Sequence, residues 1–313
     1  MGCFSVIAIL SGGVGGARLA AGFAEVAREE VTIIVNTADD EEFYGLHVSP
    51  DVDTVLYTLS GMGDWERGWG IGGDTFRCNE MLGRLGLENW FKIGDADLAM
   101  SLYRSLMLRQ GHRLTEVVER ARRALGVKAR ILPMSDDRVR TMVVTESAVL
   151  PFQQYFVKLR CEPKVLGVVF DGIEGARPTE EVLEALKTAE VIVIAPSNPV
   201  VSIGPILSLR GVRELIRKSG AERLAVSPII GGKTVKGPAD RMLAALGIEP
   251  TAVGVYKLYS DIIDIMVLDT EDSKLAPLIE GDGKRCIVTS TLMHNRDEAA
   301  RLARTILDHV GRI

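Results

Sequence analysis

The residues with the clearest chemical potential form a glycine-rich turn near the start of the chain. The turn reads Ser-Gly-Gly-Val-Gly-Gly-Ala-Arg over residues 11–18, with glycine at Gly12, Gly13, Gly15 and Gly16. Glycine allows a sharp turn and a close ligand, because no Cβ stands in the way. Between a strand and a helix, such a turn aims backbone N–H groups and the helix dipole at a phosphate. We expect a phosphate site here, although a purely structural turn has the same composition.

The spacing of this turn matches neither standard phosphate-binding fingerprint. The pattern Gly-x-Gly-x-x-Gly would need glycine where the chain has Arg18, and a P-loop would need Gly-Lys-Ser/Thr at residues 17–19. An NAD(P)-dependent oxidoreductase is therefore disfavoured. It stays an alternative, because the order of strand, glycine turn, helix, strand and acid permits it.

Acidic residues form the second group of candidates. Asn36 and Asp40 follow an apolar run, while Asp51 and Asp53 stand at the start of a predicted helix. If these loops converge, Asp40, Asp51 and Asp53 form a cluster of hard oxygen ligands that suits Mg²⁺ bridging a diphosphate. The structural alternatives are loop capping by the first pair and complementation of the helix dipole by the second.

Two later loops carry groups that suit an anion. Ala-Pro-Ser-Asn-Pro at residues 195–199 follows an apolar run and brings the side chains of Ser197 and Asn198 to its end. The loop at residues 227–238 contains three glycines and two lysines before a helical pattern. We predict a second anion-binding loop there, and a flexible surface loop with solvated lysines is the alternative.

The elements that must position these residues alternate between β-branched runs and helical patterns. This alternation predicts an α/β fold with a Rossmann-like, doubly wound and mostly parallel sheet, in which ligands bind at the carboxyl ends of the strands. The predicted strands are residues 4–10, 31–36, 165–170, 191–195, 224–227, 263–268 and 286–290. The predicted helices between them are residues 17–27, 180–188, 211–218, 238–246 and 296–310.

The region from residue 50 to residue 127 has a different pattern. It contains helical periodicities at residues 51–59, 75–85, 97–109 and 114–125, almost without strands. Residues 128–162 read as extended chain with a hairpin formed by 142–145 and 149–152. We therefore predict a nucleotide-binding core from residues 1–49 and 128–313, with a helical insertion at 50–127.

Composition excludes several classes of protein. The net charge is −5 and no basic tract stands out, which disfavours a nucleic-acid binder. The four cysteines are scattered without a Cys-x-x-Cys pair, so neither a zinc site nor a disulfide framework is indicated. The first apolar run lacks a basic flank, and no run is long enough to span a membrane. We expect a cytoplasmic protein with reduced thiols.

Seven segments, in order along almost the whole chain, resemble the 2-phospho-L-lactate transferase family. That family acts in the biosynthesis of the deazaflavin coenzyme F-420. Each segment alone is a weak signal, but their shared order is specific. The segments are Ser-Gly-Gly-Val-Gly-Gly-Ala-Arg-Leu (11–19), Asn-Thr-Ala-Asp-Asp (36–40), Ser-Pro-Asp-Val-Asp-Thr (49–54), Trp-Gly-Ile-Gly-Gly-Asp-Thr-Phe (69–76), Leu-Pro-Met-Ser-Asp-Asp (132–137), Ala-Pro-Ser-Asn-Pro (195–199) and Ser-Pro-Ile-Ile-Gly-Gly-Lys (227–233).

The resemblance implies a reaction between two small molecules. A guanosine diphosphate-linked 2-phospholactate, or its phosphoenolpyruvate relative, donates its phospho-acyl half to the terminal ribityl hydroxyl of the deazaflavin Fo, and GMP is released. It further implies Mg²⁺ as cofactor, a homodimer, and an insertion that contributes to the Fo site.

The resemblance also implies roles for particular residues. Asp53 is expected to be catalytic, to bind Fo and to bind the metal; Lys92 is expected beside Fo, and Asp40 as the other metal ligand. The expected donor-binding residues are Gly12, Gly13, Gly15, Gly16, Asn36, Ser197 and Asn198.

A regulatory protein of the gluconeogenesis-factor type is the other alternative. Such proteins have a similar glycine turn and a similar Asn-Thr-x-x-Asp segment, and they would bind a nucleotide sugar without turnover. The Trp-Gly-Ile segment at residues 69–71 and the region of Lys92 favour the transferase.

Overall fold

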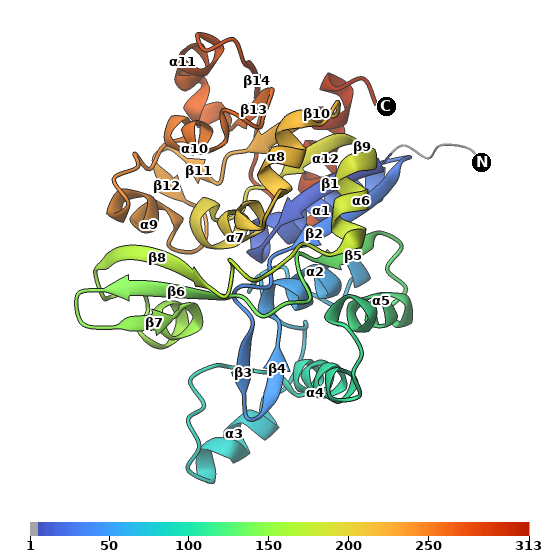
Figure 1. Cartoon of the computed structure of the whole chain (residues 1–313), viewed down its shortest axis with the longest axis vertical. Helices are drawn as coiled ribbons and strands as arrows, with labels where there is room; N and C mark the ends of the chain where they lie inside the picture. Colours follow the sequence, from blue (N-terminus) through green and yellow to red (C-terminus); the bar gives the residue numbers. More distant parts are fainter. Residues whose placement is uncertain (1–5, 313) are drawn as a thin grey trace.

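A computed structural model of the chain describes residues 6–312. Its centre is a seven-stranded parallel sheet in the order β14-β13-β10-β9-β1-β2-β5 (Figure 1). The strand order changes direction between β1 and β9, which is the position where doubly wound sheets open a ligand crevice. The predicted fold class is confirmed. The strands are β1 (Val6–Ser11), β2 (Glu30–Val35), β5 (Arg130–Pro133), β9 (Ala189–Ile194), β10 (Glu222–Val226), β13 (Ile265–Leu268) and β14 (Arg285–Val288).

Helices cover both faces of this sheet, and successive strand residues point to opposite faces. Ile7 and Ile9 of β1 join one apolar cluster, while Ala8 and Leu10 join the other. The first face carries α1 (Gly13–Val26), α2 (Pro50–Ser60), α5 (Leu114–Ala124) and α12 (Arg296–His309). The second carries α6 (Glu180–Thr188), α7 (Gly204–Ser208), α8 (Val212–Lys218), α9 (Ala239–Ala245), α10 (Ala252–Tyr259) and α11 (Ala276–Glu280). Burial on both faces explains why the strands of the central sheet are mostly apolar.

A separate antiparallel sheet projects from the core and is called the arm below (Figure 1). It consists of β6 (Arg140–Thr145), β7 (Val149–Pro151) and β8 (Val165–Asp171) in the order β7-β6-β8. The predicted hairpin is confirmed, but the assignment of residues 165–170 to the parallel sheet is wrong. Val169 lies on the open face of β8, and Leu166 lies at an irregularity where the pairing with β6 skips it, so both are exposed although they are apolar. The apolar composition of β8 is typical of a strand buried on both faces, which explains the wrong assignment.

The segment predicted as extended chain after residue 127 contains a strand of the central sheet. Residues of β5 pair in parallel with β2 at the edge of the sheet, with Ile33 opposite Ile131. The run of four residues is short, and a proline ends it, which is why its pattern did not predict a sheet strand.

The region from residue 50 to residue 127 also contains α3 (Arg77–Arg84) and α4 (Asp95–Arg109), which lie beside the hairpin of β3 (Glu41–Phe43) and β4 (Leu46–Val48) (Figure 1). In contrast, α2 and α5 contribute Val55 and Val118 to the apolar cluster on the sheet. The division into a core and an insertion stays a prediction.

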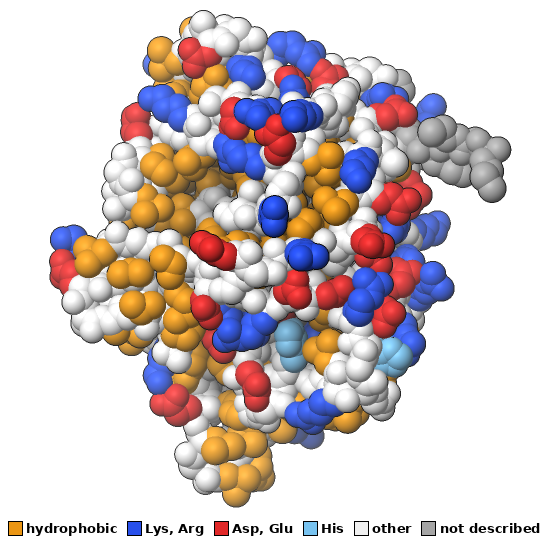
Figure 2. Space-filling model, viewed as in Figure 1, with side chains coloured by type: hydrophobic (Ala, Val, Ile, Leu, Met, Phe, Trp, Pro, Cys, Tyr) orange, Lys and Arg blue, Asp and Glu red, His pale blue; other side chains and the backbone are white. Residues whose placement is uncertain are grey.

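Short elements complete the fold: the hairpin β11 (Ile229–Ile230) with β12 (Lys233–Thr234), and single helical turns at Gln154–Lys158, Pro199–Ile203 and Thr270–Leu275. Hydrophobic side chains remain on the surface of the arm and of the α3 region (Figure 2). The exposed apolar residues there are Val149, Leu166, Val169, Met81, Leu85 and Leu87.

The described range leaves out a few predicted features. Phe4 and Ser5 of the first predicted strand, Cys3, and both ends of the predicted core lie outside it. Cys78, Cys161 and Cys286 are free thiols. Within residues 6–312, no helix combines the length and the apolar character needed to cross a bilayer.

Candidate functional site

A cavity of about 550 Å³ opens where the strand order changes direction. Its walls come from the glycine turn after β1, the loop after β9, the start of α2, the 67–70 and 90–97 segments, residues 152–157 after β7, and residues 236–238. The volume lies in the range of pockets that bind small molecules. Besides the glycine turn, the lining contains the carboxylates Asp39, Asp51, Asp53 and Asp97, the cations Arg67, Lys92 and Lys236, and the aromatic residues Tyr57, Trp69, Trp90, Phe91, Phe152 and Phe156.

The glycine turn packs tightly against the loop after β9. The Gly12 N–H donates to Ser197 Oγ at 3.1 Å, and the Ser197 hydroxyl donates back to the Gly12 carbonyl at 2.7 Å. A Cβ at Gly15 would collide with the carbonyl oxygen of Pro196, and one at Gly16 with the hydroxyl of Ser11. Close approach of two loops therefore gives these glycines a structural reason, whatever the cavity binds.

The first N–H group of α1 donates a hydrogen bond to a carboxylate of the protein itself, that of Asp51. Gly13 N–H donates to Asp51 Oδ1 at 2.8 Å, and the Asn36 amide donates to Asp51 Oδ2 at 2.9 Å. Burial raises the pKa of Asp51 to about 6, against the opposing effect of these two hydrogen bonds. Val14 and Gly15 follow Gly13 in the first turn, where N–H groups have no helical acceptor, and both residues line the cavity.

The structure places five of the seven predicted donor-binding residues on the cavity wall: Gly12, Gly13, Gly15, Ser197 and Asn198. Gly16 and Asn36 are buried behind the wall. Asn36 instead holds Asp51, and its side-chain oxygen accepts from the Ala38 N–H at 3.0 Å. Asn198 begins a helical turn by accepting from the Val200 N–H at 2.9 Å.

Asp53 lies on the cavity wall with one oxygen paired and the other free. Its Oδ1 accepts from the guanidinium of Arg104, a side chain that is 1% exposed. Its Oδ2 is buried and has no hydrogen-bond partner among the described residues. Burial acts to lower the pKa of Arg104, but the charge and hydrogen bond of Asp53 outweigh it and raise that pKa. The sequence does not indicate this role for Arg104, because an arginine in an amphipathic helix is normally solvated.

A second carboxylate, Asp97, lies on the same wall. The hydroxyl of Tyr57 donates to Asp97 Oδ1 at 2.8 Å, and both residues line the cavity. Burial, together with the charge of Asp53, raises the pKa of Asp97 to about 7. The sequence pattern indicates no role for Tyr57 or Asp97, since Asp97 looks like an ordinary acid in the first turn of a helix.

The predicted magnesium ligands differ in how free their oxygens are. Asp40 is buried, accepts from the Ser49 hydroxyl at 2.7 Å and lies 2.8 Å from His47 Nε2, so both oxygens are engaged. Asp39 and Asp53 are both lining residues, and each has one buried oxygen that has no hydrogen-bond partner within residues 6–312. Within residues 6–312, no three His, Cys, Asp or Glu side chains are grouped to hold a metal.

These oxygens fit a magnesium ion that arrives with a substrate. Mg²⁺ is commonly held by one or two carboxylates together with substrate phosphates and water. Asp39 and Asp53 offer the two free oxygens, whereas Asp40 would first have to release Ser49 or His47. Burial raises the pKa of Asp39 well above its ordinary value, and repulsion from Asp51 adds to the shift.

Cations from two loops meet at the cavity. Lys236 Nζ donates to the carbonyl oxygens of Arg67 at 3.0 Å and Glu66 at 3.3 Å. The Arg67 guanidinium stacks on the ring of Trp69, 4.6 Å from its centroid. The predicted anion-binding loop at 227–238 thus brings Lys236 to the wall. Lys92 also lines the wall and donates to Asn79 Oδ1 at 3.2 Å.

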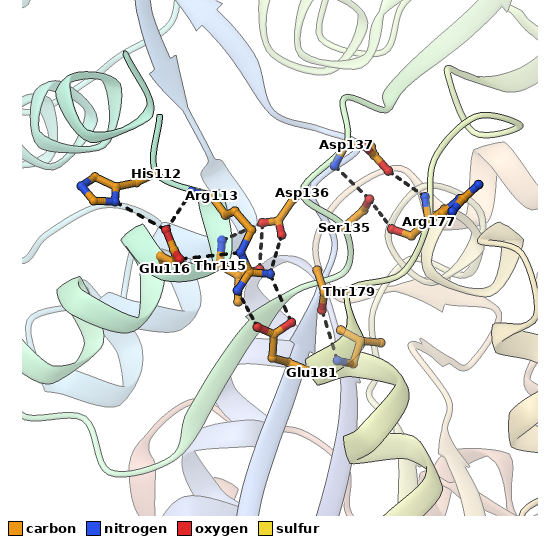
Figure 3. Close-up of polar contacts among 11 residues, drawn as sticks. His112, Arg113, Thr115, Glu116, Ser135, Asp136, Asp137, Arg177, Thr179 and Glu181 are labelled. Carbon is orange, nitrogen blue, oxygen red and sulfur yellow. Dashed lines mark hydrogen bonds and ion pairs between the residues drawn. The ribbon is translucent and has the colours of Figure 1, made fainter. Parts of the chain in front are cut away.

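The acids of the 132–137 segment lie away from the cavity lining and hold the fold together (Figure 3). Asp136 Oδ1 accepts from both the N–H and the hydroxyl of Thr115, each at 2.8 Å, at the start of α5. Asp137 Oδ2 accepts from the Arg177 N–H at 2.9 Å. Arg113 bridges Asp136 and Glu181. This segment therefore ties the end of β5 to α5 and to the loop before α6.

Comparison with known proteins gives consistent matches. Residues 7–302 match the family model described as 2-phospho-L-lactate transferase CofD. The 2-phospho-L-lactate transferases of Methanocaldococcus jannaschii and Methanopyrus kandleri are 39% and 41% identical over 311 and 305 residues, covering 98% and 96% of both chains. A phosphoenolpyruvate transferase of Streptomyces griseus is 43% identical over 311 residues, covering 96% of this chain and 97% of that relative.

The solved structures include a Bacillus halodurans protein with a TM-score of 0.66, covering 97% of this chain and 99% of that chain. At 19% sequence identity, this likeness shows the fold alone.

Proposed function

The chain belongs to the 2-phospho-L-lactate transferase CofD family, which makes it a transferase of coenzyme F-420 biosynthesis, and we propose the reaction that its cavity performs. The donor is a guanosine diphosphate-linked phospho-acid, and the acceptor is the terminal ribityl hydroxyl of Fo. The phospho-acyl half moves to that hydroxyl and GMP leaves. Family membership decides against the oxidoreductase and the nucleotide-sugar regulator.

One observation carries this proposal: a single cavity joins the glycine turn to Asp53 and to a group of aromatic side chains. The N–H groups of Val14 and Gly15 suit a diphosphate, with Ser197 and Asn198 beside them. Trp69, Trp90 and Phe156 offer ring faces and apolar area to a flat deazaflavin. Transfer at phosphorus depends mainly on positioning and charge neutralisation, which such a cavity can supply.

We assign Asp53 and Lys92 to the acceptor and Mg²⁺ to the donor phosphates. Asp53 and Asp39 would hold the ion through their unpartnered oxygens, and Asp40 stays a candidate that depends on release of its present partners. Bound Mg²⁺ would neutralise charge on the diphosphate. Arg104 keeps Asp53 in place from behind the wall.

The test replaces Asp53 by asparagine, which keeps the shape of the side chain and removes its charge. We expect Asp53→Asn to fold and to lose turnover by about 10²–10³-fold, the range for a lost electrostatic contact in a closed site. Product formation from Fo and a GDP-linked donor, with Mg²⁺ present, is followed by mass spectrometry. The exposed Asp171→Asn on the arm is the matched control. Wild-type turnover by Asp53→Asn would remove Asp53 from the mechanism.

The phospho-acid is proposed as phospholactate or phosphoenolpyruvate, because relatives with both names are about equally similar to this chain. Competition between the two GDP-linked donors, read from the product masses, identifies the preferred one. We also propose a cytoplasmic homodimer, for which the exposed apolar side chains of the arm offer a contact surface.

A further inference from the structure

Two carboxylates of the cavity wall have very different partners. Asp53 is paired with the fully buried guanidinium of Arg104, a fixed positive charge. Asp97 is paired with the hydroxyl of Tyr57, a neutral donor. Burial raises the pKa of both carboxyl groups. At Asp53 the charge and the hydrogen bond of Arg104 oppose this rise, whereas the hydrogen bond that opposes it at Asp97 comes from a neutral phenol.

We propose that Asp97 accepts the proton of the attacking hydroxyl, while Asp53, fixed by Arg104, orients that hydroxyl. The inference rests on the proposed function, since it needs an acceptor alcohol in this cavity. Asp97, Asp53 and Tyr57 all line the cavity, and the charge of Asp53 acts on Asp97.

The transfer balances with these groups. The acceptor oxygen forms a bond to the phosphorus that carries the phospho-acid, and the bond from that phosphorus to the bridging oxygen breaks. GMP leaves with the bridging oxygen and its electron pair. The hydroxyl proton passes to a free oxygen of Asp97 and from there to solvent, which restores the carboxylate.

The groups that face Asp97 explain why it can exchange a proton near neutral pH. Burial and the charge of Asp53 favour its protonated form, and the nearby Asp74 acts in the same direction. The hydrogen bond from Tyr57 and the charge of Arg104 favour the ionised form. The balance leaves the pKa of Asp97 at about 7, where a general base works well.

The experiment measures the single-turnover transfer rate against pH. In the wild-type enzyme the rate falls on the acid side as Asp97 becomes protonated. Asp97→Asn lowers the rate by about 10²–10⁴-fold, the usual contribution of general-base catalysis. The dissociation constants of Fo and GDP stay within about twofold of the wild-type values. The fall of the rate on the acid side of the pH profile, called the acid limb below, disappears.

A second variant keeps the carboxylate and changes only its partner. In Tyr57→Phe the hydrogen bond that lowers the pKa of Asp97 is lost, so the acid limb moves to higher pH. At high pH, where Asp97 is ionised, this variant recovers most of the wild-type rate. A merely structural contact would not shift the pH profile in this direction.

The matched control is Asp95→Asn, because Asp95 lies on the same helix and outside the cavity lining. It should leave the position of the acid limb unchanged. A wild-type rate and pH profile in Asp97→Asn would overturn the inference, as would an unmoved or lowered limb in Tyr57→Phe. Absence of transfer to Fo by the wild-type enzyme would instead refute the proposed function, so the two failures are distinguishable.

Discussion

Replacement of Arg104 by methionine would test how much the buried ion pair between Arg104 and Asp53 stabilises the protein. Methionine has similar length and no charge, so the helix keeps its shape while the pair with Asp53 is lost. The Arg104 side chain is 1% exposed, and it also donates to the His47 carbonyl at 3.2 Å. In the variant, both oxygens of Asp53 would be buried without a partner, because Oδ2 has none in the described part of the chain.

The size of the effect follows from that burial. Removing one partner of a buried ion pair costs about 3–5 kcal/mol, because the other charge stays behind uncompensated. For 313 residues, an unfolding entropy of ~2.1 cal/mol/K per residue gives ~0.7 kcal/mol/K, so Tm should fall by about 5–8 °C. Without Arg104, the pKa of Asp53 is higher in the folded state than in the unfolded state. The stability penalty is therefore small at low pH and grows as the pH rises through the pKa of folded Asp53.

Thermal and urea unfolding at about pH 5 and pH 8 measure this penalty in Arg104→Met. Asp53→Asn and the double variant complete a mutant cycle, in which the double variant should lose less than the sum of the single losses. The reasoning is refuted if Arg104→Met costs less than about 1 kcal/mol at pH 8, the range of a surface pair. Equal penalties at both pH values would refute it as well.

Two further variants separate structure from binding. Gly15→Ala puts a Cβ against the Pro196 carbonyl, so we expect a loss of about 1–3 kcal/mol from overpacking together with weaker GDP binding, measured by urea unfolding and calorimetry; unchanged stability would show that the two loops have room to separate. Asp136→Ala removes the acceptor for the first turn of α5 and should cost about 0.5–2 kcal/mol with kcat unchanged; a large loss of kcat at wild-type stability would place Asp136 in the catalytic machinery.

Much of the fold could be predicted because buried strands appear in the sequence as runs of apolar residues. Strands β1, β2 and β9 are mostly apolar, since helices cover both of their faces. The failures have the same physical origin. Strand β8 is apolar although one face is open, and β5 is too short for its pattern to be distinguished from a loop. Periodicity reports the burial of a residue, whereas the partner strand depends on contacts distant in sequence.

The candidate site could be predicted where residues suited to binding follow directly after strands of the central sheet. The glycine turn and the Ser-Asn pair lie at the carboxyl ends of strands, and a doubly wound sheet brings those ends together. Asn36 and the 132–137 acids show the limit, because the same polar residue types also build caps and loop contacts. Arg104 and Asp97 lie on a helix far from the sheet in sequence, and only packing brings them to Asp53.

The charge balance of the cavity constrains how the donor binds. Four carboxylates line a cavity proposed to bind a diphosphate, and one of them, Asp51, already takes the Gly13 N–H. Two like charges 4 Å apart repel by about 4 kcal/mol at an effective dielectric constant of 20, so the donor needs compensating positive charge. Arg67 and Lys236 supply part of it from the opposite loops. Burial is the largest cause of the raised pKa values of Asp39 and Asp51, and repulsion from neighbouring carboxylates adds to both shifts. A donor that arrives with Mg²⁺ removes this repulsion, and the N–H groups of Val14 and Gly15 can then bind phosphate beside an ionised Asp51.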